Sequence, residues 1–269
     1  IKAIIGDVRD RNRVESQIQR YRPHIIFHAA AYKHVPLMEE FPAQAVLANV
    51  LGTRNMADLA VKYNVSRFVM VSTDKAVNPT NVMGASKRIA EIYVQSLFLH
   101  LKETQKDCTK FITTRFGNVL GSNGSVVPYF KKLISQGGPI TVTHPDIIRY
   151  FMTIPEASSL VLKSATLGNA GEIFVFDMGQ PVKIADLARN MIRLAGFVPG
   201  KDIEMTYVAK GGGSECFGGT RHRVVAFADG IKGIENFLVN ATLLTRSGVH
   251  RDSKEQYARL LGIEIGVDV

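Results

Sequence analysis

The sequence predicts an α/β fold, with a doubly wound parallel sheet and a smaller second lobe. Along residues 1–122, short apolar runs rich in β-branched residues alternate with longer segments that carry apolar residues at helical spacing. This alternation is typical of βαβ units, whose parallel strands are joined by right-handed crossovers. Residues 123–210 have shorter elements and more Gly and Pro, which predicts the smaller lobe. With 269 residues, of which 46% are hydrophobic, the chain can bury a large core.

The expected elements succeed one another in a regular order. They are a strand at 3–5, a helix around 12–20, a strand at 24–28, helices over 42–63, a strand at 67–72, a helix over 81–101, a strand at 110–115 and an amphipathic helix at 186–194. Asn78 is suited to cap the 81–101 helix, with Pro79 at its first position. The Gly cluster at 211–219 is expected to form a loop or linker.

The segment 72–87 combines a strand end, two adjacent charges and a helical lysine. The apolar run before it predicts a buried strand, so Asp74 and Lys75 come directly after its carboxyl end, where open α/β sheets bind their ligands. Met83 and Lys87 are four residues apart and therefore share one helix face. Asp74 and Lys75 could act as acid and base if burial shifts their pKa values toward neutrality. The alternative is that they form only a turn.

These residues carry a resemblance to a known superfamily. A serine after a strand and a Tyr-x-x-x-Lys motif in the next helix mark the short-chain dehydrogenases/reductases, and here Ser72 and Lys87 match while Met83 stands at the tyrosine position. The methionine, the pair Asp74-Lys75 and the Asn-Pro-Thr-Asn segment after them resemble the nucleotide-sugar 4,6-dehydratases of bacterial polysaccharide biosynthesis that act on UDP-N-acetylglucosamine. The resemblance covers residues 1–207 and implies a Rossmann-like sheet.

The resemblance implies a tightly held NAD, rather than NADP, as cofactor. Segments 6–10, 28–38 and 49–53 resemble the parts of the family that lie along this cofactor. The implied cofactor-binding residues are Asp7, Val8, Ala29, Ala30, Ala31, Lys33, Asn49, Ser72 and Lys87. The family's glycine-rich loop, which binds the pyrophosphate, is expected upstream of Ile1, because no G-x-G-x-x-G motif comes after a strand here. We therefore expect the sheet to lack its first βαβ part.

The resemblance also implies a UDP-sugar as substrate, held by segments similar to 115–122 and 149–157. The implied substrate-binding residues are Arg115, Asn118, Ser125, Lys131 and Arg149. Arg115 and Arg149 adjoin apolar runs, and a buried guanidinium needs an anionic partner. That partner is either a UDP phosphate or an internal carboxylate.

The implied reaction removes water from UDP-N-acetylglucosamine by transient hydride transfer to NAD and gives a UDP-4-keto-6-deoxy sugar. The implied catalytic residues are Thr73, Asp74, Lys75, Met83 and Lys87, with Asp74 as acid and Lys75 as base. Thr73 or Ser72 would bind the substrate hydroxyl. A thioether cannot accept a proton, so Lys87 would bind the nicotinamide ribose and help the C4 hydroxyl proton to leave. Viewed alone, Met83 is typical of a residue that fills a gap in a core.

The sequence alone leaves other functions open. A 4-epimerase of the same superfamily would return the hydride to C4 without eliminating water, and a reductase would consume external NADPH. An inactive fragment or interaction module is a third alternative, because the glycine loop is not found and residues 211–269 show no resemblance. The expected domains are a partial NAD-binding domain at 1–122, a mainly substrate-binding lobe at 123–210 and a divergent tail at 211–269.

Composition narrows the expected partners. The formal net charge is +9, and residues 201–269 contain nine basic and nine acidic residues. The excess of positive charge therefore lies in the part that resembles the family, where it could attract an anionic dinucleotide or UDP-sugar. No basic stripe interleaved with aromatics indicates nucleic acid, and no apolar run is long enough for a membrane span. Cys108 and Cys216 have no metal-ligand spacing and fit a reducing compartment.

From these features we expect no metal site and a cytoplasmic location, either alone or as the cytoplasmic domain of a membrane-anchored parent, the form that the resembled family has. We also expect a homo-oligomer, because an open sheet edge favours association with another chain.

Overall fold

The computed structural model describes residues 1–104, 108–168, 171–208, 222–224 and 263–265. The chain divides into two compact units, of which the first comprises 1–115, 161–175 and 219–269 and the second comprises 116–160 and 176–218. Most of the expected tail at 211–269, including its Gly cluster and Cys216, lies outside the described residues. The exception is an antiparallel pair of strands. These strands are β11 (His222–Val224) and β12 (Ile263–Ile265).

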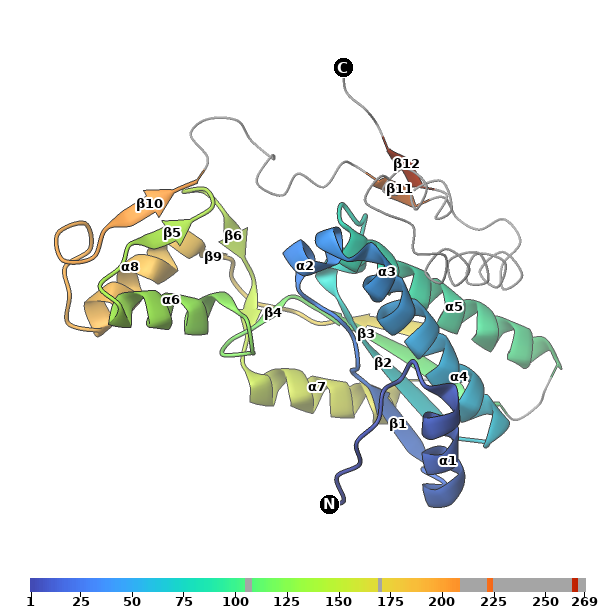
Figure 1. The fold of residues 1–269 in the computed structure, drawn as a ribbon. Helices are drawn as coiled ribbons and strands as arrows, with labels where there is room; N and C mark the ends of the chain where they lie inside the picture. The colour runs from blue at the N-terminus through green and yellow to red at the C-terminus, as the bar shows by residue number, and fades with distance from the viewer. Residues whose placement is uncertain (105–107, 169–170, 209–221, 225–262, 266–269) are drawn as a thin grey trace. The chain divides into compact units, whose positions relative to one another are not determined.

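A four-stranded parallel sheet forms the centre of the first unit (Figure 1). Its strands are β1 (Ile25–His28), β2 (Arg67–Thr73), β3 (Lys110–Phe116) and β8 (Glu172–Val175), in the order β1-β2-β3-β8. β1 pairs with β2, and β3 with β8, in parallel register. The predicted α/β fold with a parallel, Rossmann-like sheet is therefore confirmed.

Helices precede and connect these strands; the sequence predicted those around 12–20, 42–63 and 81–101, but not those at 35–40 and 154–167. They are α1 (Arg11–Tyr21), α2 (Val35–Glu40), α3 (Pro42–Ala45), the π-helix η1 (Val46–Leu51), α4 (Gly52–Lys62), the 3-10 turn η2 (Asp74–Ala76), α5 (Val82–Thr104) and α7 (Ile154–Leu167). α3, η1 and α4 run on without a break and match the helices expected over 42–63. None of the helices in the described part of the chain has both the length and the apolar composition that a membrane crossing requires.

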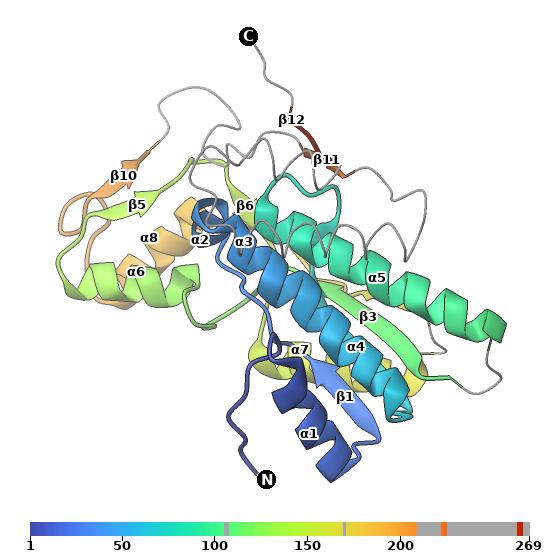
Figure 2. The ribbon, with the colours of Figure 1, turned by 45° about the vertical axis from the view of Figure 1, so that its right-hand side comes forward.

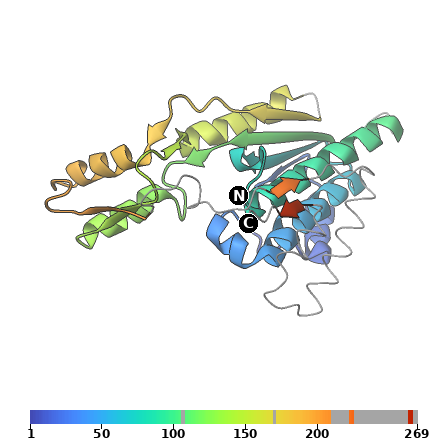
Figure 3. The same cartoon turned by 90° about the horizontal axis from the view of Figure 1, so that it is seen from above.

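The alternation of side chains along β2 places helices on both faces of the sheet. Phe68 and Met70 belong to a buried cluster with residues of α1, α4 and α5, whereas Val69, between them, packs with Ile112 and with Ala165 of α7. Figures 2 and 3 show α4 and α5 on one side of the strands and α7 on the other. A parallel sheet that is covered on both faces explains why its strands read as nearly continuous apolar runs.

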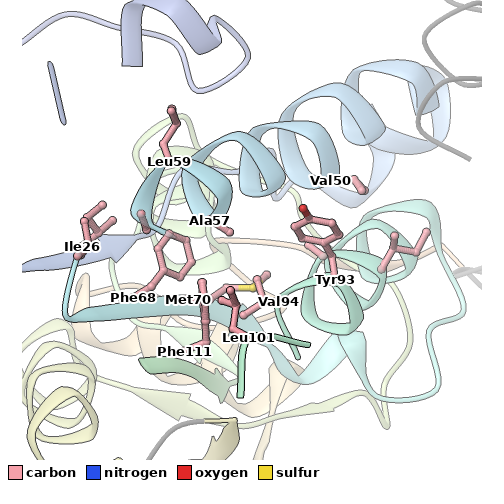
Figure 4. Close-up of a cluster of buried hydrophobic side chains, with 14 of the residues drawn as sticks. Ile26, Val50, Ala57, Leu59, Phe68, Met70, Tyr93, Val94, Leu101 and Phe111 are labelled. Atoms are coloured by element: carbon pink, nitrogen blue, oxygen red, sulfur yellow. The ribbon is translucent and has the colours of Figure 1, made fainter. Parts of the chain in front are cut away.

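The larger of these clusters is the main core of the first unit (Figure 4). The rings of Phe68 and Phe111 lie 5.4 Å apart between their centroids, and both side chains are inaccessible to solvent or nearly so. Leu59 of α4 and Ile89 of α5 are fully buried in the same cluster. Each such side chain contributes about 1.5–3 kcal/mol by leaving water, so this cluster fixes α4 and α5 on the sheet.

The second unit consists of short elements around a separate core. They are β4 (Asn118–Val119), α6 (Val126–Ser135), β5 (Ile140–Val142), β6 (Ile148–Arg149), β7 (Phe151–Met152), β9 (Val182–Lys183), α8 (Ile184–Leu194) and β10 (Met205–Tyr207). β5 pairs with β10, β4 with β7 and β6 with β9. Phe130 of α6 and Ile192 of α8 are buried in the core, and α8 confirms the helix expected at 186–194.

Two local predictions were wrong. Residues 3–5 form no strand, and Ile5 is exposed: among the described residues no strand pairs with this segment, although the outer edge of β1 is open. Asn78 does not cap α5: its φ of 45° lies in the left-handed region and the helix begins only at Val82. Asn81 supplies the cap, since its Oδ1 accepts a hydrogen bond of 2.8 Å from the N–H of Gly84.

The core makes a testable prediction. Phe68→Ala should lower the free energy of unfolding by about 3–5 kcal/mol, because it removes a fully buried ring from contact with Phe111 and leaves a cavity. Urea unfolding measures this loss. Leu99→Ala is the control, since the side chain of Leu99 is 60% exposed and its removal should change stability by less than about 0.5 kcal/mol. Equal losses in the two variants would contradict the proposed core.

Candidate active site

The carboxyl ends of β1 and β2 place eight of the eighteen implied site residues at one edge of the sheet. The chain leaves β1 through the exposed Ala29 and Ala30, and it leaves β2 through Ser72 and Thr73 into the turn η2. Neighbouring parallel strands end at the same edge, which is where open α/β sheets bind ligands. The structure thus brings together the two segments in which the sequence predicted cofactor-binding and catalytic residues.

Lys87 lies in the first half of α5, and its ammonium is buried under this edge. Its Nζ donates a hydrogen bond of 2.7 Å to the backbone carbonyl of Val71, one residue before Ser72. Burial lowers the pKa of Lys87 to about 8, and the nearby Glu91 carboxylate opposes this shift. A lysine with a pKa this close to neutrality can donate and accept protons near physiological pH.

The turn after β2 holds an ion pair. Lys75 Nζ lies 3.0 Å from Asp74 Oδ1, and Thr73 Oγ1 donates a 2.8 Å hydrogen bond to the same carboxylate oxygen. The side chains of Asp74 and Lys75 are 50% and 29% exposed, so the burial that was expected for this pair is not found. An exposed pair of this kind adds little to stability, about 0–1 kcal/mol.

The hydroxyl of Ser72 differs from its neighbours because its polar atom is buried and has no hydrogen-bond partner among the described residues. Ser72 is only 4% exposed. A buried hydroxyl that makes no hydrogen bond costs about 1–3 kcal/mol, so a ligand that bonded to it would recover this energy. The position at the end of β2 agrees with a ligand-binding role.

Met83 is buried on the first turn of α5. It packs in a small cluster with Met38 of α2 and Ala45 of α3, and Val35 and Val82 lie against the same cluster. The cluster joins α2 and α3 to the start of α5. The thioether therefore fills an apolar gap, which is the interpretation that the residue type alone suggests.

Asn49 ties the loop after β1 to α5. Its side chain accepts a 2.7 Å hydrogen bond from the Tyr32 N–H and donates 2.9 Å bonds to the Tyr32 carbonyl and to Ser86 Oγ. Asn49 is fully buried and lies in the π-helix η1, a distortion that often marks functional sites. Both amide donors are thus used within the protein, so Asn49 can act on a cofactor only through the loop that it holds.

His28, at the end of β1, belongs to the same buried polar network. Its Nε2 lies 2.9 Å from Thr53 Oγ1, which in turn donates to the carbonyl of Asn49. Burial and the charge of Lys87 lower the pKa of His28 to about 3, so the ring is neutral at physiological pH. A neutral ring beside a buried ammonium adds no further charge to the site.

Asp7 and Val8 lie before α1. Asp7 makes an exposed ion pair with Arg9, whose hydrogen bonds lower the pKa of Asp7. Val8 is held against α4, because its carbonyl accepts a 3.0 Å hydrogen bond from Asn55 Nδ2 and its side chain fills the space beside Gly52. The loop at Asp7 is therefore fixed by packing on α4.

Arg115, near the end of β3, has an internal carboxylate as its partner. Its Nε and one terminal nitrogen contact the two oxygens of Glu91 at 2.9 and 2.5 Å, and Arg88 approaches the same carboxylate at 3.1 Å. Glu91 is completely buried. Of the two partners left open by the sequence, the structure thus provides the carboxylate, and this bidentate pair fixes the end of β3 to α5.

The other implied substrate-binding residues lie in the second unit. Asn118 starts β4 and pairs with Phe151, and Arg149 ends β6, where it donates to the Ile148 carbonyl. Ser125 precedes α6 and has a buried Oγ without a hydrogen-bond partner among the described residues, whereas Lys131 is exposed on α6. The described residues contain no cluster of three or more His, Cys, Asp or Glu that could hold a metal ion.

Several polar residues of the site were missed by sequence reasoning: His28 as a buried hydrogen-bonding group, Glu39, Thr53, Ser86 and Glu91. Glu39 accepts a 2.7 Å hydrogen bond from the N–H of Val82 and thereby caps α5 from outside. A usable signal was the spacing of polar residues by four positions on apolar helix faces, as in Lys87 and Glu91. The contact of Glu39 bridges 43 residues and has no local signal.

Comparison with known proteins now identifies the family. The sequence family described as "Polysaccharide biosynthesis protein" matches residues 1–217. The chain belongs to this family. The capsular polysaccharide biosynthesis protein CapD of Staphylococcus aureus is 56% identical over 193 residues, which are 72% of this chain and 31% of CapD. The probable polysaccharide biosynthesis protein EpsC of Bacillus subtilis is 52% identical over 208 residues, 77% of this chain and 34% of EpsC. The chain thus spans about a third of these relatives.

The relatives and structural neighbours of this chain include proteins named as enzymes that act on nucleotide sugars. A UDP-glucose 4-epimerase of Rickettsia canadensis is 39% identical over 175 residues, 65% of this chain and half of the epimerase. The X-ray structure of Pen from Bacillus thuringiensis is 34% identical, with a TM-score of 0.72 over 80% of this chain and 65% of Pen. DesIV of Streptomyces venezuelae, a dTDP-glucose 4,6-dehydratase solved with NAD, shares the fold at 21% identity and a TM-score of 0.66, over 84% of this chain and 76% of DesIV.

The buried ammonium makes a testable prediction about pH. Folding lowers the pKa of Lys87 from 10.5 to about 8, so between these values the unfolded chain binds more protons than the folded one. Over this range the stability of the wild type should rise with pH relative to Lys87→Met, by at most about 1.4 kcal/mol per pH unit. Urea unfolding of both proteins across this range measures the difference.

Lys102→Met is the matched control for this measurement, because Lys102 is exposed on the same helix. The stability of Lys102→Met should depend on pH in the same way as that of the wild type. Parallel curves for the wild type and Lys87→Met would contradict the burial of the ammonium in solution.

Proposed function

We propose that this protein is a nucleotide-sugar 4,6-dehydratase that removes water from UDP-N-acetylglucosamine and uses NAD as a transient hydride carrier. The observation that carries the proposal is the Asp74–Lys75 ion pair beside the buried Lys87, at the carboxyl end of β2. An elimination needs both an acid and a base near one carbon–carbon bond, whereas epimerisation at C4 needs neither for C5 or C6. The membership in a polysaccharide biosynthesis family supports a sugar-nucleotide substrate.

The ion pair is one proton transfer away from the state that an elimination requires. Movement of a proton from Lys75 Nζ to Asp74 Oδ1, across their 3.0 Å contact, gives a neutral amine and a carboxylic acid. The amine then takes the C5 proton of a 4-keto sugar, and the acid gives its proton to the C6 oxygen, which leaves as water. Lys75 is then cationic and Asp74 anionic, so the original ion pair is restored. To complete the reaction, the hydride would return to C6 and Lys75 would give a proton to C5; Lys75 would then regain a proton from solvent, which received the proton of the C4 hydroxyl during oxidation.

The chain's own residues fit a nicotinamide cofactor at this edge of the sheet. NAD, when bound, supplies the reversible hydride acceptor that oxidises C4 and later reduces C6. Lys87 would hold the nicotinamide ribose, since two of its three ammonium protons are not used by the bond to Val71. The buried Ser72 hydroxyl, which lacks a partner among the described residues, would bind the cofactor or the C4 hydroxyl. Solved neighbours with NAD bound support this cofactor.

Substrate binding is proposed for the second unit. Asn118, Ser125, Lys131 and Arg149 would hold the UDP-sugar, and the buried Ser125 hydroxyl offers a hydrogen bond that the described residues leave unmade. Arg115 would contribute by fixing β3 to α5 through Glu91 rather than by binding phosphate. Neighbours solved with UDP-glucose and with UDP support a uridine nucleotide.

A 4-epimerase is the second candidate, because UDP-glucose 4-epimerases of Rickettsia species are 37 to 39% identical over 175 residues. The two reactions share the oxidation of C4 and differ in the fate of the resulting ketone. A product assay with UDP-N-acetylglucosamine distinguishes them, since the dehydratase releases a 4-keto-6-deoxy sugar and the epimerase releases the C4 epimer with its C6 hydroxyl retained. Release of the epimer alone would overturn the proposal.

The acid/base assignment predicts a loss of turnover in either of two variants. Asp74→Asn cannot donate the proton to the C6 oxygen, and Lys75→Met cannot accept the C5 proton, so each should lower kcat by about 10²-fold or more with a modest change in KM. Steady-state formation of the keto sugar measures both constants. Asp186→Asn, which breaks an exposed ion pair with Arg189 on α8, is the control and should keep wild-type turnover. Near-normal kcat in Asp74→Asn or Lys75→Met would refute the assignment.

A further prediction concerns Met83. If its thioether only fills the gap beside Met38 and Ala45, Met83→Leu should cost less than about 1.5 kcal/mol of stability and keep most of the turnover. Lys87→Ala should instead weaken NAD binding and turnover together, because it removes the ammonium that would hold the ribose. Calorimetric titration with NAD and the product assay test both variants. A loss in Met83→Leu as large as that in Lys87→Ala would give the sulfur atom a chemical role.

A further inference from the structure

We infer that Gly84 is a positioning residue that sets where the backbone of Lys75 lies. The inference rests on the proposed function, in which Lys75 is the base for the C5 proton. Gly84 is the buried third residue of α5, next to Met83. It contacts no substrate in this proposal and acts through the turn that carries the acid and the base.

The carboxyl end of β2 and the first turn of α5 approach each other closely at this residue. A Cβ placed on Gly84 would lie 2.2 Å from the carbonyl oxygen of Lys75, 3.1 Å from its carbonyl carbon and 3.3 Å from the Cβ of Pro79. The first distance is far inside van der Waals contact, and the atom that it meets belongs to the backbone. Only a residue without a side chain lets the Lys75 peptide rest on α5.

Both partners of this contact are held in place, so neither can easily move away. The N–H of Gly84 donates a 2.8 Å hydrogen bond to Asn81 Oδ1, which fixes the first turn of α5. On the other side, Val77 N–H donates to the Asp74 carbonyl at 3.0 Å and closes the turn that contains Lys75. Pro79 is buried against the same point. A side chain at position 84 would therefore push the turn that carries Asp74 and Lys75 outward.

A side chain at position 84 should impair the elimination at C5 and C6 and leave the oxidation at C4 intact. Lys87 lies almost one helical turn beyond Gly84 and is anchored separately to Val71 on β2. Oxidation at C4, which depends on Lys87, should survive a displacement of the turn, whereas proton removal at C5 depends on the position of Lys75. A misplacement of about 1 Å in a catalytic group can cost about 10²-fold in rate.

Gly84→Ala in the holoenzyme tests the inference. With UDP-N-acetylglucosamine we expect keto-sugar formation to fall about 10²-fold while reduced nicotinamide accumulates, seen by its absorbance, because the sugar is oxidised but not dehydrated. Exchange of the C5 proton with solvent deuterium should slow in parallel. The double variant Gly84→Ala/Lys75→Met should be no slower than Lys75→Met alone, since Gly84 acts through Lys75.

Gly168→Ala is the matched control. A Cβ there would lie 2.7 Å from Ile112 Cδ1 and 2.9 Å from the Ser164 carbonyl, so it introduces a milder clash between β3 and the end of α7, away from the turn that carries Lys75. It should lower the thermal midpoint without accumulating reduced nicotinamide. If Gly84→Ala does not fold, Pro79→Gly, which loosens the same turn, should show the same accumulation in weaker form.

The inference is overturned if Gly84→Ala keeps wild-type turnover, or if it merely gains stability, as Ala in place of Gly in an unhindered helix would. It is also overturned if Gly84→Ala and Gly168→Ala lose activity only in proportion to their loss of folded protein. Failure of the proposed function is distinguishable from failure of this inference. If the wild-type holoenzyme forms no keto sugar, the dehydratase proposal is refuted before any variant is made, and this inference is refuted with it.

Discussion

The contact between the carboxyl end of β2 and the first turns of α5 is the constraint on which the site depends. The ammonium of Lys87 is buried there and donates to the carbonyl of Val71, while the Lys75 peptide lies against Gly84 three residues earlier on the helix. A buried charge is costly, so it remains only where the surroundings hold it in one geometry. The buried ammonium of Lys87 and the absence of a Cβ on Gly84 together fix the end of β2, the turn η2 and α5 relative to one another.

The rest of the first unit supports this contact from three sides. The main core presses α5 onto β2 through Phe68, Met70 and Ile89. Glu91, completely buried, ties α5 to the end of β3 through Arg115, and Asn49 ties Ser86 of the same helix to the loop after β1. Because α5 is joined to β2 by apolar packing and to β3 and Asn49 by hydrogen bonds, displacement of the helix would break polar contacts as well as apolar packing. Such support is required for the precise placement of proton-transfer groups.

The exposure of Asp74 and Lys75 has a consequence for the proposed chemistry. Lys87 is buried and its pKa is lowered, whereas Asp74 and Lys75 form a partly exposed ion pair at this edge of the sheet. In the proposed cycle the pair begins and ends in this charged form, so it need not be neutral in the resting protein. A bound sugar would cover the pair and thereby strengthen every electrostatic interaction within it. Met83 and Lys87, by contrast, are buried on α5. The proposed reaction requires this part of the helix to be ordered.

The sequence by itself determined the parallel α/β fold, because apolar runs of strand length alternate with helical periods, and it determined the order of Ser72, Asp74, Lys75 and Lys87 around one strand end. It predicted a strand at 3–5 wrongly, since local propensity does not decide whether a segment pairs with a sheet, and it placed the α5 cap at Asn78 instead of Asn81. Only the tertiary structure decided that Arg115 meets Glu91 and that Gly84 meets Lys75. These contacts depend on which segments, distant in the sequence, lie close together in the fold. The local secondary-structure propensity of a segment contains no information about such contacts.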